Sequence, residues 1–438
     1  MKVAFQTLGC KVNQYETEAM QKLFLCAGYE LTQEIESADV VIVNTCAVTS
    51  LSSQKSRQII RRAAKVNKNS VLAVVGCYAQ NSPQEISKID GVDIIIGTTD
   101  RLKIVRLVEE IFKNRGEKIF QVADVEKISE FEELPHTPQR TRAFLKIEDG
   151  CNNFCSYCII PFTRGRVRSR SLENIRAECL ELAEKNFKEI VLTGIHIGAY
   201  GKDFKNKITL ADAVKVVLES ANPVRLRLGS IESAEMTEEL FNLLKTDSRI
   251  CNHLHLPLQS GSDEILKAMH RPYTTKNFSD LTEKIVSEIP DVSIGTDLIV
   301  GFPGETEKNF QDTLDFLDSQ PFSKIHVFPF SAREGTLAAE MKNQIDSQTK
   351  KNRVAKVLEL ARAKEKIFAE KLVGRTVEII SETEENGIVD GLTKNYVRVR
   401  LPAEKNIRLG EIIKVQIEKI SSDKKNNSYA VGKFTSDS

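Results

Sequence analysis

Three cysteines stand within one short segment, Cys151-Asn-Asn-Phe-Cys155-Ser-Tyr-Cys158. The segment directly follows a predicted strand, so a loop at the strand end can wrap three sulfurs around one cluster. A 4Fe–4S cluster has four irons, and three cysteines leave one iron open to a ligand, as catalytic metal sites do. A structural zinc site is the alternative, but it needs a fourth ligand and usually has another spacing. The motif therefore predicts a 4Fe–4S cluster held by Cys151, Cys155 and Cys158, which would also be the catalytic residues.

Three more cysteines are dispersed through the first part of the chain, and each ends a predicted strand. Cys10 follows FQTLG, Cys46 follows VIVNT and Cys77 follows VVG. The carboxyl ends of parallel strands share one edge of a sheet, where ligands bind. Thiols on such ends can converge although about 30 residues separate them along the chain. They are candidate metal ligands, and three buried small hydrophobic residues are the alternative.

Composition narrows the class of protein. The 438 residues suggest roughly three domains. A net charge of +1 does not by itself indicate that the protein binds a polyanion such as a nucleic acid. A nucleic-acid partner must therefore be argued from local groups of basic residues. No apolar run approaches the ~18 residues of a membrane span, and the first residues lack a signal-peptide core, so we expect a cytoplasmic protein with no membrane partner. Nine cysteines, an odd number, in a reducing compartment argue against a complete disulfide framework.

The elements that must position the first cysteine set are predicted over residues 1–115. Short apolar runs alternate there with helix-like stretches, the runs at 3–7, 40–44, 71–76 and 93–96 and the helices at 13–27, 51–68, 83–89 and 100–113. This βαβ rhythm is typical of a doubly wound α/β domain, a parallel sheet with helices on its faces. The segment 127–142, with its Pro and Glu residues, is predicted to be a linker.

A second α/β domain is predicted over 137–366. Its apolar runs are 143–147, 189–193, 224–228, 253–258, 292–300 and 325–330, with helical stretches at 171–186, 209–220, 237–246 and 305–318. Six βα units fit a partial (β/α)6 barrel better than a closed eight-stranded one. A long helix over 346–372 follows. From residue 373 short strands alternate with Gly, Asn and Asp, which predicts a small all-β barrel over 371–436.

The C-x3-C-x2-C motif resembles the radical S-adenosylmethionine superfamily over roughly 143–345. The resemblance implies that the open iron binds S-adenosylmethionine and that one electron cleaves it to a 5′-deoxyadenosyl radical. It also places Tyr157 against the adenine, and Gly194, Asp297 and Gly301 beside the cofactor. An ordinary strand-end turn is the alternative for Gly194. A phosphate-loop interpretation of GFPGET is weak because no Gly-Lys-Ser/Thr follows.

Nearly the whole chain resembles the methylthiotransferases, two-cluster radical enzymes that end in a TRAM domain, an RNA-binding β-barrel. The resemblance rests on TLGCKVNQYE, NTCAVT, GCYAQ, DGCNNFCSYCIIPFTRGRVRSR, HLPLQSGSDEILKAMHRPYT and FPFSAREGT. The branch acting on N6-threonylcarbamoyladenosine in tRNA is the most similar. The isopentenyladenosine branch usually has Gln-Met where this chain has Lys11 and Val12. Two departures from the family pattern, Ser233 and Asn252 where Pro is common, touch no cluster ligand.

The implied reaction replaces the C2 hydrogen of N6-threonylcarbamoyladenosine, at position 37 of tRNA, by a methylthio group. That carbon–hydrogen bond is not acidic, so a general base cannot readily remove the hydrogen as a proton. Two 4Fe–4S clusters and two S-adenosylmethionines per turnover are implied, with Cys10, Cys46 and Cys77 holding the auxiliary cluster. The implied partners are the tRNA anticodon stem-loop, an electron donor and a sulfur source, and we expect a monomer. The tRNA isoacceptors, the form of the auxiliary sulfur and the reductant are not encoded in any motif.

Basic residues mark a candidate RNA face. Arg164, Arg166 and Arg168 follow the cluster loop and would share one side if the segment were extended. They would bind anticodon phosphates or the cofactor carboxylate, and a solvated loop is the alternative. Lys394, Arg398 and Arg400 lie in the predicted β-barrel, where Arg398 and Arg400 share a strand face.

Other classes of protein remain open. One is a non-catalytic iron–sulfur protein that binds RNA or senses redox state, although such a passive cluster usually has four cysteines. Others are methylthiotransferases of the isopentenyladenosine branch or of the branch that acts on an aspartate of a ribosomal protein.

Overall fold

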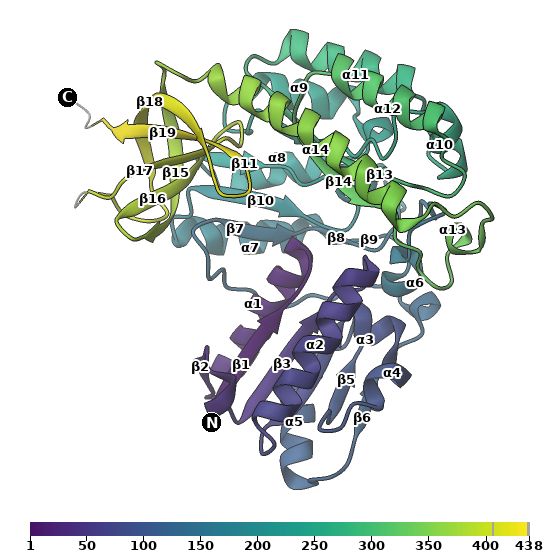
Figure 1. Cartoon of the computed structure of the whole chain (residues 1–438). Helices are drawn as coiled ribbons and strands as arrows, with labels where there is room; N and C mark the ends of the chain where they lie inside the picture. Colours follow the sequence, from purple (N-terminus) through teal and green to yellow (C-terminus); the bar gives the residue numbers. More distant parts are fainter. Residues whose placement is uncertain (405–406, 436–438) are drawn as a thin grey trace.

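The computed structural model describes residues 1–404 and 407–435. The chain forms an N-terminal α/β domain, a central (β/α) domain and a C-terminal β-barrel, and Figure 1 shows the central domain lying between the other two. The predicted fold class is confirmed in all three parts. The predicted boundary at residue 436 lies outside the described residues.

The N-terminal domain is a parallel sheet with the strand order β2-β1-β3-β4-β5-β6. Its strands are β1 (Lys2–Thr7), β2 (Glu30–Thr32), β3 (Val40–Thr45), β4 (Val71–Gly76), β5 (Ile94–Ile96) and β6 (Ile119–Gln121). The central strands β3 and β4 are buried along their whole length, which explains their continuous apolar runs. The edge strands β2 and β6 have three residues each, and no apolar run predicts them.

Helices cover both faces of this sheet, as a doubly wound fold requires. One face carries α1 (Lys11–Cys26) and α5 (Ile104–Lys113). The other carries α2 (Ser50–Val66), α3 (Cys77–Asn81) and α4 (Pro83–Ser87). Three 3₁₀ turns complete the domain and its connection, η1 (Ile35–Ser37), η2 (Arg101–Lys103) and η3 (Val125–Lys127).

The central domain has six parallel strands in two hydrogen-bonded groups, β11-β10-β7 and β12-β13-β14. They are β7 (Ala143–Lys146), β10 (Glu189–Thr193), β11 (Arg225–Arg227), β12 (His253–His255), β13 (Ser293–Val300) and β14 (Phe322–Pro329). Isolated bridges, Leu226 to Ile250 and Ser230 to His255, join the two groups. The outer strands β7 and β14 are not paired with each other. The six strands therefore form the predicted partial barrel.

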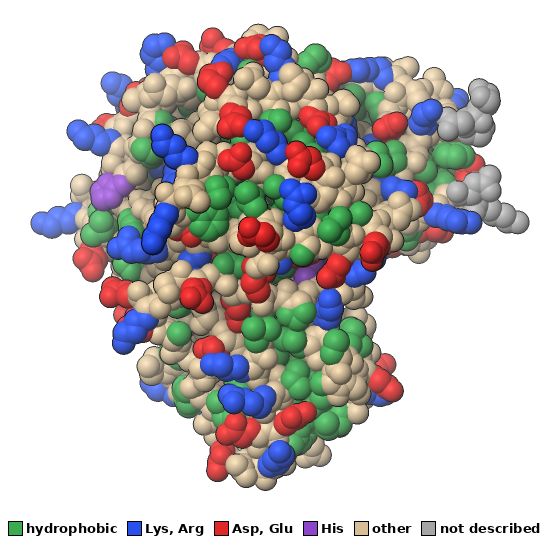
Figure 2. All heavy atoms as spheres, turned by 180° about the vertical axis from the view of Figure 1, so that it is seen from behind, with side chains coloured by type: hydrophobic (Ala, Val, Ile, Leu, Met, Phe, Trp, Pro, Cys, Tyr) green, Lys and Arg blue, Asp and Glu red, His purple; other side chains and the backbone are tan. Residues whose placement is uncertain are grey.

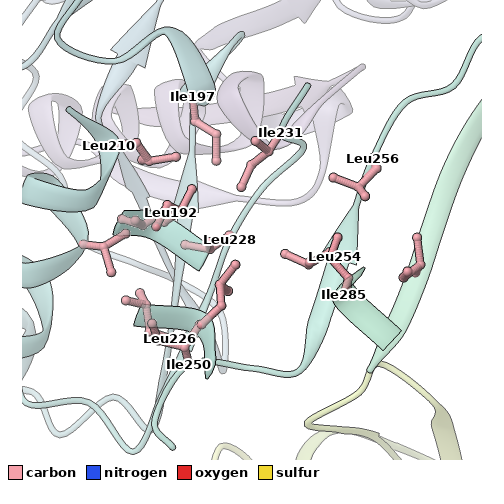
Figure 3. Close-up of a cluster of buried hydrophobic side chains, with 14 of the residues drawn as sticks. Leu192, Ile197, Leu210, Leu226, Leu228, Ile231, Ile250, Leu254, Leu256 and Ile285 are labelled. Atoms are coloured by element: carbon pink, nitrogen blue, oxygen red, sulfur yellow. The ribbon is translucent and has the colours of Figure 1, made fainter. Parts of the chain in front are cut away.

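Helices surround these strands, and Figure 1 shows α14 running across the outside of the domain. They are α6 (Ile160–Arg164), α7 (Leu172–Glu184), α8 (Leu210–Ser220), α9 (Glu238–Thr246), α10 (Asp263–Ala268), α11 (Thr275–Glu288), α12 (Glu307–Ser319), α13 (Leu337–Glu340) and α14 (Ser347–Glu370). The short elements are β8 (Glu148–Asp149), β9 (Arg168–Ser169), η4 (Ile197–Ala199) and η5 (Ser233–Glu235). Capping boxes begin α8, α11 and α12. Leucines and isoleucines such as Leu192, Leu226 and Leu254 fill the core between strands and helices (Figure 3).

The C-terminal part is a closed barrel with the strand order β15-β16-β17-β19-β18. Its strands are β15 (Thr376–Glu385), β16 (Ile388–Thr393), β17 (Arg398–Pro402), β18 (Ile412–Ser422) and β19 (Ser428–Phe434). A Cβ on Gly432 would lie 2.6 Å from the Gln416 carbonyl oxygen, so the tight barrel wall requires glycine there.

No helix in the described part of the chain is long and apolar enough to cross a membrane. Figure 2 shows acidic and basic side chains intermingled over one face of the molecule, and no extended patch of one sign dominates that face. Any nucleic-acid contact on this face would therefore depend on local groups of residues.

Candidate active site

The three-cysteine loop begins where β8 ends. Gly150 has a φ of +88°, and a Cβ there would collide with the Arg166 carbonyl group, so only glycine allows the turn into Cys151. The Cys158 amide donates to the Cys155 carbonyl oxygen at 2.9 Å, which closes the loop. The three thiols thus belong to one compact turn, as the motif predicts.

Two side-chain nitrogens lie close to these sulfurs. Arg271 Nη1 donates to Cys155 Sγ at 3.3 Å, and His196 Nδ1 lies 3.5 Å from Cys151 Sγ. Burial raises the pKa of Cys151 and of Cys158 to about 12, so without a metal these thiols stay protonated at neutral pH. A bound metal must therefore displace their protons, while the nearby donors would stabilise the resulting thiolates.

Cys10, Cys46 and Cys77 lie at the carboxyl ends of the adjacent strands β1, β3 and β4. A Cβ on Gly9 would lie 2.9 Å from the Cys46 Cβ, so the first loop presses closely against the second. Burial raises the pKa of Cys46 and Cys77, and each pKa is raised further by another cysteine of the set, Cys77 and Cys10 respectively. The sheet therefore brings the three thiols together at one edge.

Both cysteine sets have donors of the right chemistry for an iron–sulfur cluster. Within the described residues no three His, Cys, Asp or Glu side chains gather tightly enough to hold a single metal ion. A cubane is larger than one ion, and each thiolate binds a different iron. Three thiols spread around a loop or a sheet edge fit that larger group.

Arg164 connects the two cysteine sets. It is the last residue of α6 and is fully buried. Its Nε donates to Cys77 Sγ at 3.3 Å, and its Nη1 contacts Glu16 at 2.9 Å and Asp149 at 3.0 Å. Asp149 lies two residues before Cys151, so one guanidinium touches both Cys77 and the chain leading into the three-cysteine loop.

Arg164 belongs to a buried network of charges between the two α/β domains. Glu16 also pairs with Arg101 at 3.0 Å and with Lys146 at 3.0 Å. Burial alone would raise the pKa of Glu16, but the cations outweigh it and lower the pKa to about 2. The network therefore stays ionised at neutral pH and fixes the two cysteine-bearing edges relative to each other.

The predicted row of exposed arginines does not form. The segment is not extended, because α6 includes Arg164 and a glycine turn follows it. Arg168 is also buried and donates to the carbonyl oxygens of Arg164 and Arg166 at 2.8 Å. Arg166 is the exposed member of the predicted trio and lies over the Phe154 ring at 5.8 Å. The surface placement predicted for Arg164 and Arg168 is wrong, because buried carboxylates and carbonyls pair with them.

The residues predicted beside the cofactor lie around the carboxyl ends of the barrel strands. Tyr157 is half-buried against an apolar cluster that contains Phe302 and Phe330. A Cβ on Gly194 would lie 2.8 Å from both Glu148 Oε2 and Ile197 Cγ2, so internal packing already requires glycine there.

The remaining two predicted cofactor residues lie on and after β13. Asp297 lies within β13, and its Oδ2 is 3.1 Å from His255 Nε2. Gly301 has a φ of +72°, and its amide donates to the Glu305 carboxylate at 3.0 Å. Glu305 is itself paired with Arg353 at 2.5 Å, so this carboxylate has a structural role. The assignment of these residues to the cofactor stays a prediction.

A cavity of about 800 Å³ lies where the three domains meet. The barrel strands contribute residues to its wall, the N-terminal domain contributes Lys11, and the C-terminal barrel contributes the stretch from Asn395 to Arg398. Burial lowers the pKa of Lys11. The sequence motifs do not reveal this cavity, because its walls come from positions hundreds of residues apart. Lys11 directly follows Cys10 in the sequence, and this position could have indicated that Lys11 lies near a functional site.

Tyr396 is one of the residues through which the C-terminal barrel contacts the central domain. It has a φ of +68°, an unusual backbone conformation for a bulky residue. Its ring stacks on His253 at 4.4 Å, and Arg227 lies over it at 4.8 Å. Arg227 also donates to the carbonyl oxygens of Lys394 and Thr393. The contact fixes this side of the cavity.

The basic residues predicted for RNA binding in the C-terminal barrel lie beside the cavity. Arg398 is exposed, and Arg400 is half-buried. Both contact Asp390, at 3.2 and 3.0 Å. Lys394 donates to the Ser248 carbonyl oxygen, so part of its role is to dock the barrel.

Comparisons with known sequences agree with this arrangement. An uncharacterized protein family, UPF0004, matches residues 2–97, and the radical SAM superfamily matches residues 145–317. The threonylcarbamoyladenosine tRNA methylthiotransferase MtaB of Bacillus subtilis is 44% identical over 95% of this chain and 94% of its own length. The protein of the same name in Aquifex aeolicus is 38% identical, over 95% of this chain and all of its own. A tRNA-2-methylthio-N(6)-dimethylallyladenosine synthase of Thermoanaerobacter is 37% identical over 86% of this chain and 81% of its own.

Solved structures share the fold at low sequence identity. A radical S-adenosylmethionine methyltransferase from Kitasatospora setae has a TM-score of 0.57 at 14% identity, covering 77% of each chain. The cobalamin-dependent radical enzyme OxsB has a TM-score of 0.52 at 12% identity, covering 82% of this chain and 61% of its own. The sequence relatives span nearly the whole chain, both α/β domains included. The chain therefore belongs to the radical S-adenosylmethionine methylthiotransferase family.

Proposed function

We propose that this protein transfers a methylthio group to C2 of N6-threonylcarbamoyladenosine at position 37 of tRNA. The observation that carries the proposal is the meeting of two three-cysteine sets at one domain interface, bridged by Arg164. A radical enzyme with one cluster needs one three-cysteine set. An enzyme that also transfers a group from a second, sulfur-bearing centre needs a second set to hold that centre. The names of the relatives from Bacillus subtilis and Aquifex aeolicus support the choice of substrate.

We assign one 4Fe–4S cluster to Cys151, Cys155 and Cys158 and another to Cys10, Cys46 and Cys77. When bound, these clusters and S-adenosylmethionine would supply the radical and the methylthio group. The residues of this chain orient and shield that chemistry. Arg271 and Arg164 place N–H groups beside Cys155 and Cys77, and a ring nitrogen of His196 lies beside Cys151. The role of the protein is thus positioning, electrostatics and exclusion of water.

The cavity of about 800 Å³ fits a modified nucleoside, since ligand pockets typically measure ~300–1,000 Å³. Enzymes that react at a base take it out of the stack and bind it in such a pocket. Arg398 and Arg400, which line the cavity, remain our candidates for phosphate contacts, together with Lys394 of the same barrel and the exposed Arg166 beside the three-cysteine loop. Arg164 and Arg168 are excluded because they are buried. An electron donor and a sulfur source complete the proposed partners of this protein, which we propose acts as a monomer.

Iron counting after anaerobic reconstitution tests the two-cluster assignment. We expect about eight irons in the wild type and about four in the Cys151/Cys155/Cys158 triple Ala variant, since each cubane holds four. The Cys10/Cys46/Cys77 triple Ala variant is the matched control and should also retain about four. Four irons in the wild type and none in the first variant would leave the N-terminal cysteines as core residues.

Product analysis tests the substrate. The reconstituted enzyme, with S-adenosylmethionine and a reductant, is given tRNA carrying N6-threonylcarbamoyladenosine or isopentenyladenosine, or a ribosomal protein. Mass spectrometry of the digests should find the methylthio group on the first substrate. Transfer to isopentenyladenosine instead would move the protein to the branch of its Thermoanaerobacter relative. Equal transfer activity in a Cys155→Ala variant would refute the radical mechanism.

A further inference from the structure

Lys11 differs from the other cations that line the cavity. Arg142, Lys324, Arg398 and Arg400 line it too, and each has a carboxylate partner. Those partners are Glu382, Glu365 and, for the last two, Asp390. The ammonium group of Lys11 has no hydrogen bond or ion pair with any other described residue.

The carboxylates near Lys11 are already paired with other cations. Arg142, Arg227 and Glu189 all lie within electrostatic range of Lys11, but the two arginines already share Glu189, at 3.4 and 2.7 Å. Glu382 is already paired with Arg142 at 2.5 Å. This corner of the cavity therefore holds one more cation than carboxylates. Because a half-buried cation near two arginines is costly to leave without a counter-charge, the corner fits a ligand that brings an anionic oxygen.

We infer that Lys11 is a specificity-determining residue that binds the carboxylate of the threonylcarbamoyl group. This inference rests on the proposed function. The threonyl end of this nucleoside carries a carboxylate, whereas a dimethylallyl group carries none. Lys11 directly follows Cys10, so the recognised end of the substrate lies next to the auxiliary cysteine set. The charged contact selects substrates by the group on N6, several bonds away from the reacting carbon.

Binding of synthetic anticodon stem-loops tests this inference without any turnover. One stem-loop carries N6-threonylcarbamoyladenosine, and the other carries its threoninamide analogue, in which a neutral amide replaces the carboxylate. Affinities are measured anaerobically on the iron-loaded protein. The wild type should prefer the carboxylate by roughly 10- to 100-fold, the range of a hydrogen bond to a charged group. Lys11→Met should bind both stem-loops with about equal affinity.

Two variants serve as controls. Lys11→Arg keeps the charge and should keep the preference, which would assign the loss in Lys11→Met to the missing charge. Lys276→Met removes an exposed amine of α11 that pairs with Asp280 outside the cavity, and it should also keep the preference. Iron content is measured for each variant, because Lys11 adjoins a proposed cluster ligand.

The carboxylate of S-adenosylmethionine is the other anion that could meet Lys11. If Lys11→Met weakened binding of S-adenosylmethionine and kept its preference for the carboxylate stem-loop, the inference would be overturned. It would also fall if the wild type bound both stem-loops equally. Either result leaves the proposed function standing, provided that the wild type still methylthiolates tRNA carrying N6-threonylcarbamoyladenosine.

Discussion

Arg164 shows how far single residues can be understood from the sequence. The alternation in TRGRVRSR predicted a row of exposed arginines, but Arg164 and Arg168 are buried. The partners that bury Arg164 are Glu16, almost 150 positions earlier, and Asp149. A local pattern cannot identify partners so distant. The positions of the six candidate cysteines, in one loop and at adjacent strand ends, were easier to predict, because their signal is a short spacing or the end of a strand. Their assignment to clusters stays a prediction.

Replacing Arg164 should destabilise the junction between the two cysteine sets. Arg164→Met would leave Glu16 and Asp149 buried with fewer cations, and we expect a loss of about 3 kcal/mol in the free energy of unfolding. The loss should not be larger, because Lys146 still contacts both carboxylates. Anaerobic urea unfolding measures the change.

Arg166→Met is the matched control for that experiment. Arg166 is exposed and lies only two positions away, so its replacement should stay within about 0.5 kcal/mol of the wild type. Equal unfolding midpoints for the two variants would mean that the buried network does not hold the domains together.

Among the secondary-structure elements, those with long apolar runs or clear helical periodicity were predicted well. The central strands β3 and β4 and the helix α14 lie close to their predicted positions. The short edge strands β2 and β6 were missed, because three half-exposed residues leave no pattern. The segment 127–142 is a linker without helix or strand after η3, as predicted. It is nevertheless partly buried, because His136 anchors it.

His136 ties two helices of different domains together. Its Nε2 lies 3.0 Å from Glu18 of α1, its Nδ1 lies 2.9 Å from Glu178 of α7, and its ring stacks on Tyr15 at 4.1 Å. Burial alone would lower the pKa of His136, but the hydrogen bonds to the two carboxylates outweigh it and raise the pKa. The folded protein is therefore most stable when the His136 ring is protonated.

This arrangement predicts a pH-dependent stability. A raised pKa in the folded state means that the stabilisation is complete below about pH 6.5, the ordinary value, and is lost as the pH rises through the folded pKa. His136→Gln should therefore lower the melting temperature most at low pH, and its difference from the wild type should shrink as the pH rises. Melting curves from pH 6 to pH 9 measure this. His270→Asn, at an exposed histidine with a φ of +59° outside this network, is the control for removing an imidazole elsewhere on the protein.

At the scale of the whole molecule, the cavity depends on all three domains at once. Its walls combine Lys11, the inward residues of β13 and β14, and Tyr396. The sequence predicted each domain separately, but no sequence pattern predicted how the domains are oriented against one another. Docking depends on contacts such as Arg227 with the backbone of Thr393 and Lys394. Those contacts join residues more than 160 positions apart, and only the folded chain brings them together.

The docking of the three domains also determines where the tRNA backbone would run, because it places Arg398 of the C-terminal barrel at the cavity. Arg398 is exposed at the cavity rim, where it would contact a phosphate next to the bound nucleoside. Arg398→Ala should weaken binding of every tRNA about equally and reduce the salt dependence, measured as the slope of log K against log[salt], by ~0.7–0.9 per lost contact. The carboxylate preference assigned to Lys11 should persist in this variant, because phosphate contacts position the RNA and do not select the base. Lys284→Ala, on the outer helix α11, is the control and should leave both the affinity and the slope unchanged. An unchanged slope in Arg398→Ala would place the tRNA on another face of the molecule.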